Sequence, residues 1–293
     1  MAVRELKSSP SMATIYPKAV AGVGLSALGR LPGRGGEAGE LPDEELVLPD
    51  VEIDREHLAA YDRVCTFQIR DELPPTYPHV IAFPLAMKLM TATSFPFPVV
   101  GLVHIANRIE LVHPILVGER LIVRVRTEGL APHDKGTQFQ VIASADVGGE
   151  TVWRSNSTYL HREGGGDSSG KREVDRGEKP PEPIAQLSVP DDIGRRYAGV
   201  SGDRNPIHLH PLSARLFGMP RPIAHGMWLK ARCLAVLESE LPDSYAVDVR
   251  FKLPVRLPGR VDLASWREGG EHRFAVHDAG SDRPHLTGRI GAD

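Results

Sequence analysis

The chain has 293 residues and a formal net charge of −3 at pH 7. This length predicts about two domains. The charge lacks the basic excess that nucleic-acid-binding proteins need, so we expect no nucleic-acid partner. The two cysteines, Cys65 and Cys233, lie far apart and form no C-x-x-C pair. This spacing argues against a disulfide framework and a thiolate zinc site, and it indicates a reducing, cytoplasmic location.

Near the N-terminus a small-apolar run extends from Ala19 to Leu28, preceded by Lys18. The run is rich in glycine and falls short of the roughly 20 residues that span a bilayer. We therefore expect no membrane association. We interpret the run as an N-terminal strap or short helix, with a secretion signal as the alternative.

The first half contains a helical pattern in FPLAMKLMTATSFPFPV, residues 83–99. Pro96 and Pro98 fall within it, and a proline removes a backbone donor and clashes with the preceding turn. The sequence therefore predicts a short or kinked helix here.

A hydrophilic segment separates the two halves. It reads REGGGDSSGKREVDRGEKPPEP over residues 162–183 and is almost free of apolar residues, so it cannot form a core. We expect a first domain over residues 1–161, a linker over 162–183 and a second domain over 184–293.

The stretch YAGVSGDRNPIHLHP opens the second half and places Asp203 five residues before His208. On an unbroken helix these side chains would project in different directions. Pro206 disfavours a helical conformation at Asn205, which predicts a bent loop that brings the acid and the imidazole together. The alternatives are a turn or cap role for Asp203 and a satisfied, half-buried imidazole for His208.

Helices and strands follow this loop. Pro211 is expected to start a short helix with Leu212 and Leu216 on one face. Apolar residues at spacings of three and four from Ile223 to Leu241 predict a core-facing helix of about 18 residues. The period then changes to two, which predicts antiparallel strands, with Glu268 to Gly270 as a hairpin turn. The expected strands are Val247–Leu253, Val261–Trp266, Arg273–His277 and His285–Ile290.

Gly226 is expected at or near the start of the long helix, within RPIAHGMWL. The first N–H groups of a helix have no intrahelical partner and lie at the positive end of its dipole, so they can hold a developing oxyanion. His225, directly before it, is expected among the substrate-binding residues. The alternative is that Gly226 only permits close packing and that His225 is a core or boundary residue. In the first half Phe83 and Pro84 occupy the equivalent place, and a proline has no N–H to donate.

The order of motifs repeats between the halves, which indicates a duplicated domain. The paired positions are Tyr61 with Tyr197, Ile81 with Ile223 and Pro114 with Pro254. The first half lacks the Asp203/His208 loop. Each half would be a long helix with an antiparallel sheet wrapped around it, an α+β fold.

The Tyr197–Pro211 stretch and the RPIAHGMWL motif resemble the MaoC-like, hydratase 2-type (R)-specific enoyl-thioester hydratases. The duplicated layout resembles their double hotdog members, most of all the actinobacterial 3-hydroxyacyl-thioester dehydratases. The resemblance implies reversible hydration of trans-2-enoyl thioesters carried on coenzyme A or acyl carrier protein, with no metal and no nicotinamide cofactor.

The resemblance also implies roles for single residues. Asp203 and His208 would hold the water, Asn205 would orient them, Ser201 would line the site and the Gly226 N–H would bind the thioester oxygen. The family commonly has an Asp where this chain has His210, so we expect a weakened helix cap there.

Further expectations concern the partners of the site. We expect Lys230, Arg232 and Arg250 near the phosphates of the carrier. The first half either binds a long acyl chain in space left by its shorter helix or only completes the sheet. The chain is expected to be a monomeric double hotdog or a homodimer. The rival functions are a non-catalytic acyl-thioester-binding subunit and a hotdog thioesterase.

Overall fold

The computed structural model describes residues 1–16, 39–162 and 180–291. The apolar run from Ala19 to Leu28 and most of the expected linker lie outside these residues. No helix in the described ranges combines the length and the apolar character needed to cross a bilayer. Cys65 and Cys233 are both free and buried.

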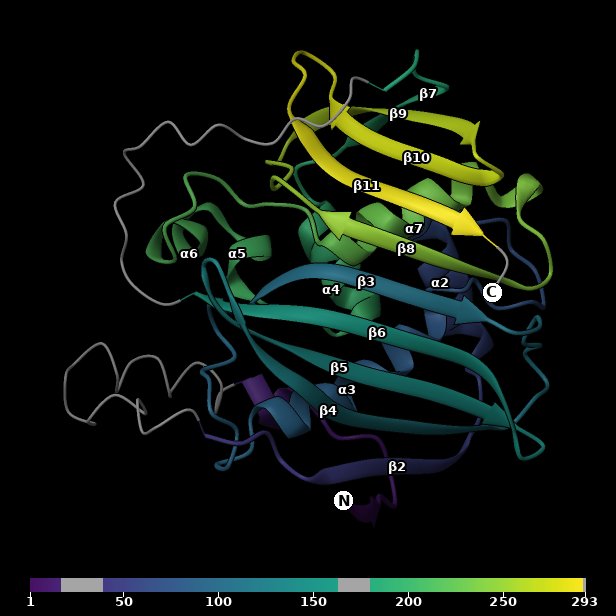
Figure 1. The fold of residues 1–293 in the computed structure, drawn as a ribbon, viewed down its shortest axis with the longest axis vertical. Coiled ribbons are helices and arrows are strands. Elements are labelled where there is room, and N and C mark those ends of the chain that lie inside the picture. The colour runs from purple at the N-terminus through teal and green to yellow at the C-terminus, as the bar shows by residue number, and fades with distance from the viewer. Residues whose placement is uncertain (17–38, 163–179, 292–293) are drawn as a thin grey trace.

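One curved sheet of 11 strands carries the helices together on one face (Figure 1). The first-half elements are β1 Ala2–Glu5, β2 Glu44–Val51, α2 Arg55–Cys65, α3 Tyr77–Met90, β3 Val103–Leu111, β4 Leu121–His133, β5 Gly136–Val147 and β6 Glu150–Arg162. The second-half elements are β7 Ala185–Val189, α4 Ile193–Ser201, α5 Pro206–Leu209, α6 Pro211–Leu216, α7 Gly226–Val236, a 3₁₀ turn Glu238–Glu240, β8 Tyr245–Phe251, β9 Gly259–Glu268, β10 Glu271–Asp278 and β11 Pro284–Gly291.

The strand order repeats between the halves. The sheet runs β1-β2-β4-β5-β6-β3-β8-β11-β10-β9-β7, so apart from β1 the two halves have the same order when each is read inward from its edge. The halves meet where β3 pairs with β8 in antiparallel register, with Ala106 opposite Arg250 and Leu111 opposite Tyr245. The α+β class and the antiparallel sheets expected from sequence are confirmed.

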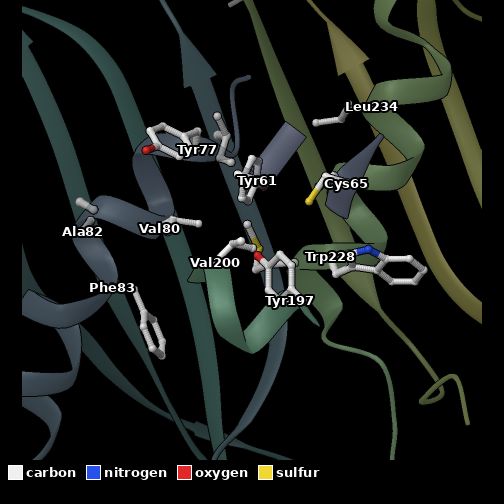
Figure 2. Packing of buried hydrophobic residues seen from close by; sticks show 14 of the residues in the cluster. Tyr61, Cys65, Tyr77, Val80, Ala82, Phe83, Tyr197, Val200, Trp228 and Leu234 are labelled. Atoms are coloured by element: carbon white, nitrogen blue, oxygen red, sulfur yellow. The ribbon is translucent and has the colours of Figure 1, made fainter. Parts of the chain in front are cut away.

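The helices of the two halves share one core. Tyr61 of α2 and Tyr197 of α4 lie with ring centroids 6.3 Å apart, and Figure 2 shows them with Cys65 and Trp228 between the helices. The Trp228 indole donates to the Val64 carbonyl oxygen at 3.1 Å. Tyr61 and Tyr197, which the repeat makes equivalent positions, therefore lie near each other between the two halves.

Helix lengths differ from the expectation in both halves. The helix α7 has 11 residues instead of about 18. It starts late because Ile223 and Ala224 donate their N–H groups to the carbonyl oxygens of Ile207 and Val255 and stay extended. It ends at Val236, before the 3₁₀ turn Glu238–Glu240. The helix α3 has 14 residues and ends before Pro96 and Pro98. It is therefore longer than α7, and the expectation of a shorter first-half helix is wrong.

The short helix expected from Pro211 is confirmed as α6, and Leu212 and Leu216 lie on an exposed side of it, with exposed fractions of 65% and 84%. Pro84 lies in the interior of α3 and not at its start. At the true start of α3, the Tyr77 N–H donates to the Pro74 carbonyl oxygen. The next residue, Pro78, has no N–H. The first two positions of this helix therefore offer no free donor comparable to that expected at Gly226.

Candidate active site

The loop between α4 and α5 carries Asp203. Helix α4 ends at Ser201, and Gly202 adopts a left-handed conformation with φ of 73° that turns the chain away from the helix axis. Asn205 then accepts a hydrogen bond from the Ile207 N–H at 3.4 Å and caps α5, with Pro206 in its first turn. The bent loop is present, and His208 sits on the one-turn helix that follows it.

Hydrogen bonds orient the Asp203 carboxylate. Its Oδ1 accepts from the Tyr16 hydroxyl at 2.9 Å and from the Asn205 N–H at 3.1 Å. The Asp203 N–H donates to Ser201 Oγ at 3.1 Å. These donors occupy Oδ1 and leave Oδ2 for a ligand.

The His208 ring is fixed in one tautomer. Its Nδ1 lies 2.8 Å from the Ile223 carbonyl oxygen, and because a carbonyl only accepts, the proton resides on Nδ1. The lone pair on Nε2 is therefore available to accept a proton. Helix α4 packs closely behind this residue, since a Cβ at Gly194 would overlap the His208 carbonyl oxygen.

His225 supports both members of the pair. Its ring stacks on His208 with centroids 3.7 Å apart and an interplanar angle of 27°. Its Nε2 lies 3.0 Å from the Asp203 carbonyl oxygen, to which it donates, and 3.8 Å from Asp203 Oδ2. His225 therefore ties the loop to the start of α7.

The side chains of Asp203, His208 and His225 converge, with potential ligand atoms within 4.8 Å of one another. These are residue types that bind zinc, and a catalytic zinc site uses three protein ligands. Because His225 Nε2 donates its proton to a carbonyl oxygen, that nitrogen cannot coordinate a metal at the same time. The remaining carboxylate and imidazole are suited to accept hydrogen bonds from one water molecule.

Burial and neighbouring groups set the protonation states. Burial raises the pKa of Asp203, but His225, His208, the Asn205 N–H and the Tyr16 hydroxyl favour the carboxylate and hold the pKa below its ordinary value. Burial lowers the pKa of His208, against the effect of Asp203. Burial and His208 together lower the pKa of His225 to about 3. Near neutral pH the site therefore holds a carboxylate and two neutral imidazoles.

The start of α7 faces the same cavity. Gly226 is its first residue, and no side chain caps the helix. The Phe251 ring packs against this residue, since a Cβ at Gly226 would lie 2.9 Å from Phe251 Cε1. Glycine thus allows both the ring and a ligand to approach the backbone.

The cavity has a volume of about 420 Å³ and is lined by both halves. The second half contributes Asp203, His208, His225 and Gly226, and the first half contributes an apolar wall. Residues of this wall include Phe83, Met87, Met90, Leu102, Val103 and Leu160. The volume is in the range of small-molecule sites.

Some predicted site residues lie elsewhere. Ser201 is buried and does not line the cavity; it supports Asp203 from behind. His210 retains the cap, because its Nδ1 accepts from the Leu212 N–H at 3.2 Å. The expected weakening of this cap by loss of an acid is thus offset by the imidazole.

The three basic residues expected near the carrier do not line the cavity. Lys230 is fully buried, with an exposed fraction of 0%. Arg232 donates to the Cys65 carbonyl oxygen at 3.1 Å, and Arg250 lies on β8 at the seam with β3. Lys135 and Arg162, both exposed, lie at the cavity instead.

Sequence reasoning missed the residues that reach the site from the first half. Tyr16 contacts Asp203 across 187 positions of sequence, and no local motif marks it. His104 and Tyr159 line the cavity with stacked rings 4.6 Å apart. A register shift in β3 at His104 redirects side chains there, and a one-residue bulge leaves no clear trace in a single sequence.

Comparison with known proteins places this geometry in a family. The MaoC like domain model matches residues 173–287. The chain is 36% identical to 3-hydroxyacyl-thioester dehydratase X of Mycobacterium tuberculosis over 253 residues, which is 86% of this chain and 90% of that protein. The chain belongs to the MaoC-like dehydratase family.

Solved structures agree with this assignment. The crystal structure of HtdX from Mycobacterium tuberculosis matches with a TM-score of 0.75 and 34% identity, covering 84% of this chain and 98% of the other. A conserved hypothetical protein of the same organism with a double hotdog fold matches with a TM-score of 0.52 and 12% identity, covering 83% of this chain and 92% of the other. This MaoC-like protein therefore has the double hotdog fold that we expected from its sequence.

Proposed function

We propose that this MaoC-like protein is a hydro-lyase that hydrates trans-2-enoyl thioesters to (3R)-hydroxyacyl thioesters and catalyses the reverse dehydration. The observation that carries the proposal is the convergence of Asp203, His208 and the Gly226 end of α7 on one cavity. The carrier would be coenzyme A or acyl carrier protein. The reaction uses neither a metal nor a nicotinamide cofactor.

In this proposal Asp203 and His208 form a catalytic dyad that holds the water. Asp203 Oδ2 and His208 Nε2 each accept a hydrogen bond from it, which directs an oxygen lone pair toward C3 of the substrate. As the C3–O bond forms, the dyad takes one proton from the water, and it then gives this same proton to C2 of the enolate-like species. One water molecule is thus added across the double bond, and the dyad returns to its starting protonation state.

Negative charge develops on the thioester oxygen as C3 is attacked. The Gly226 N–H at the start of α7 would donate to this oxygen, where the helix dipole adds to the effect. Loss of one such donor costs roughly 3–4 kcal/mol in other enzymes. The dyad and the start of α7 then have separate roles. The dyad moves the proton, and the helix end stabilises the enolate-like charge.

We propose that the first half binds the acyl chain and carries no dyad of its own. The apolar wall from α3 and β3 supports this role, because it lines the same cavity as the dyad. Exposed Lys135 and Arg162 at the cavity are suited to meet the carrier phosphates. If the first half only completed the sheet, neither the apolar wall nor these two basic side chains would contact a ligand.

The expected division into residues 1–161, 162–183 and 184–293 stands as a proposal alongside this assignment of roles. We also propose a cytoplasmic location, which the two free thiols support. Either a monomer or a homodimer is compatible with a site built within one chain.

Replacing either dyad residue tests the function. We expect Asp203→Asn and His208→Gln each to nearly abolish hydration of crotonyl-CoA without unfolding the protein, because an amide cannot take a proton from the water and return it. The assay follows loss of enoyl absorbance, with chiral analysis of the product and thiol detection in parallel. Exposed Asp191→Asn and His113→Gln are matched controls that should retain activity.

Three outcomes separate the candidate functions. Loss of enoyl absorbance with a (3R) product supports the hydratase. Thiol release without hydration identifies a thioesterase, and binding without turnover identifies a non-catalytic subunit. Near wild-type hydration by either dyad variant contradicts the assigned roles.

A further inference from the structure

Tyr16 joins the N-terminal segment to the catalytic loop. Its hydroxyl donates to Asp203 Oδ1 at 2.9 Å and accepts from the Arg204 N–H at 2.6 Å. The residue lies at the cavity and comes from outside both motifs that identify the family. One phenol therefore contacts both the side chain of Asp203 and the backbone that follows it.

The N-terminal segment is held in place by the core. Strand β1 pairs in parallel with β2 at the edge of the sheet, and Leu6 and Ile15 are buried with exposed fractions of 7% each. Met12 packs at Gly202, where a Cβ would lie 3.4 Å from Met12 Cγ. These contacts fix the position of Tyr16 before any ligand enters.

The two bonds to Tyr16 act in one direction. The Arg204 N–H donates to the phenol oxygen, and the phenol in turn donates to the carboxylate, so the first bond polarises the second. Together with the Asn205 N–H this occupies Oδ1, and only Oδ2 is left to face His225 and the cavity. A carboxylate held at one oxygen cannot rotate to exchange its two oxygens.

We propose that Tyr16 is a positioning residue that holds Asp203 ionised and presents Oδ2 to the reacting water. This inference rests on the proposed hydratase function and adds a residue that the family motifs do not include. Tyr16 acts through Asp203 and takes no proton itself, since burial and Asp203 raise the pKa of its phenol far above neutrality.

Other titratable groups also face Asp203. They are His225 of α7, His208 of α5, His79 of α3, His104 of β3, Tyr159 of β6 and Tyr197 of α4. Burial lowers the pKa of His79 to about 4 and that of His104 to about 3. Above those values they are neutral, and the hydrogen bonds from the Asn205 N–H and Tyr16 add to the favourable effect of His225 and His208 on the charged carboxylate.

The Tyr16→Phe variant of the full chain tests this inference, with crotonyl-CoA as substrate. Loss of one hydrogen bond to the carboxylate raises the pKa of Asp203, so the acid limb of the kcat/KM profile should move up by about one pH unit. We expect kcat at neutral pH to fall about tenfold, as for loss of one bond to a charged group, with KM close to that of the wild type.

Tyr245→Phe is the matched control, because Tyr245 is a buried tyrosine of β8 that does not line the cavity. Its profile should match the wild type. An unshifted acid limb in Tyr16→Phe overturns the inference, including the case in which only the melting temperature falls. If the wild type hydrates crotonyl-CoA, Asp203→Asn does not, and Tyr16→Phe behaves as the wild type, then the inference alone fails. Absence of hydration in the wild type refutes the proposed function itself.

Discussion

Gly194 determines how closely α4 approaches the dyad. It lies in the first turn of that helix, and a Cβ there would overlap the His208 carbonyl oxygen. Because a backbone atom is the obstacle, no side-chain rotation can relieve the contact. The absence of a side chain at Gly194 thus allows α5 to place the imidazole beside Asp203.

We therefore expect Gly194→Ala to displace α5 and lower kcat by about 100-fold, the scale associated with an ångström of misplacement at a catalytic group. Steady-state kinetics with crotonyl-CoA, together with a thermal unfolding curve, would measure both effects.

Gly199 of the same helix supplies the control. A Cβ there meets nothing within 4 Å, so Gly199→Ala should leave kcat unchanged and raise stability by about 0.5–1 kcal/mol. Equal activity in the two variants would show that the approach of α4 does not determine the dyad geometry.

At this scale the sequence predicts what is local. Asp203, His208 and Gly226 lie in two short motifs whose proline and glycine residues restrict the backbone, so their convergence follows from turn chemistry. Tyr16 and His104 reach the site through long-range packing of the sheet and core. Such contacts depend on tertiary structure, and no local spacing of residues in the sequence indicates them.

Helix α3 contributes to the wall of the cavity that holds the dyad. Phe83, Met87 and Met90 point from it into the cavity, and the helix is apolar along most of its length. Pro84 lies within it without ending it. The space for a ligand therefore comes from the side chains that α3 presents and not from a reduced length.

A larger side chain in this wall should reduce the length of the acyl chain that the cavity accepts. We expect Met87→Trp to lower hydration of a sixteen-carbon enoyl-CoA by about tenfold or more relative to crotonyl-CoA, because the added ring occupies space for the acyl chain. The ratio of kcat/KM for the two substrates is the measurement.

Met87→Leu preserves volume and should keep the wild-type ratio. If Met87→Trp slows both substrates equally, or if the wild type already rejects the long chain, then the first half is only a scaffold.

Periodicity predicts the helices and strands better than it predicts where they end. The four expected strands of the second half correspond to β8 to β11, and the turn at Glu268 to Gly270 is formed with positive φ at Gly269 and Gly270. The helix α7 begins three residues later than its apolar pattern, because backbone pairing with neighbouring loops keeps Ile223 extended. Such competition between hydrogen bonds depends on residues distant in sequence.

Lys230 joins the two halves at the β3–β8 seam. Its ammonium donates to Asn107 Oδ1 at 2.6 Å, to the Asn107 carbonyl oxygen at 3.2 Å and to the Val247 carbonyl oxygen at 3.1 Å. The Asn107 amide continues the network to Ser155 Oγ at 2.9 Å and Ser157 Oγ at 3.0 Å. The fully buried Lys230 amino group of the second half is thus hydrogen-bonded mainly by the first half.

Removing the ammonium should destabilise the whole molecule. We expect Lys230→Met to lower the free energy of unfolding by about 2–4 kcal/mol, since three acceptors lose their donor in a buried position. Chemical denaturation followed by fluorescence would report the loss.

Lys88→Met, on the corresponding helix of the first half, should have little effect because Lys88 is only half-buried. An unchanged denaturation midpoint for Lys230→Met would show that the network does not stabilise the seam.

The pairing of β3 with β8 has a consequence for how such a molecule can diverge. Cutting the chain at the seam would leave each half with a bare strand edge, so a half produced alone would need another polypeptide to cover it. In a tandem chain the other half of the same polypeptide covers that edge. One copy is then free to lose its chemistry and specialise in shape, while the other retains the reactive groups.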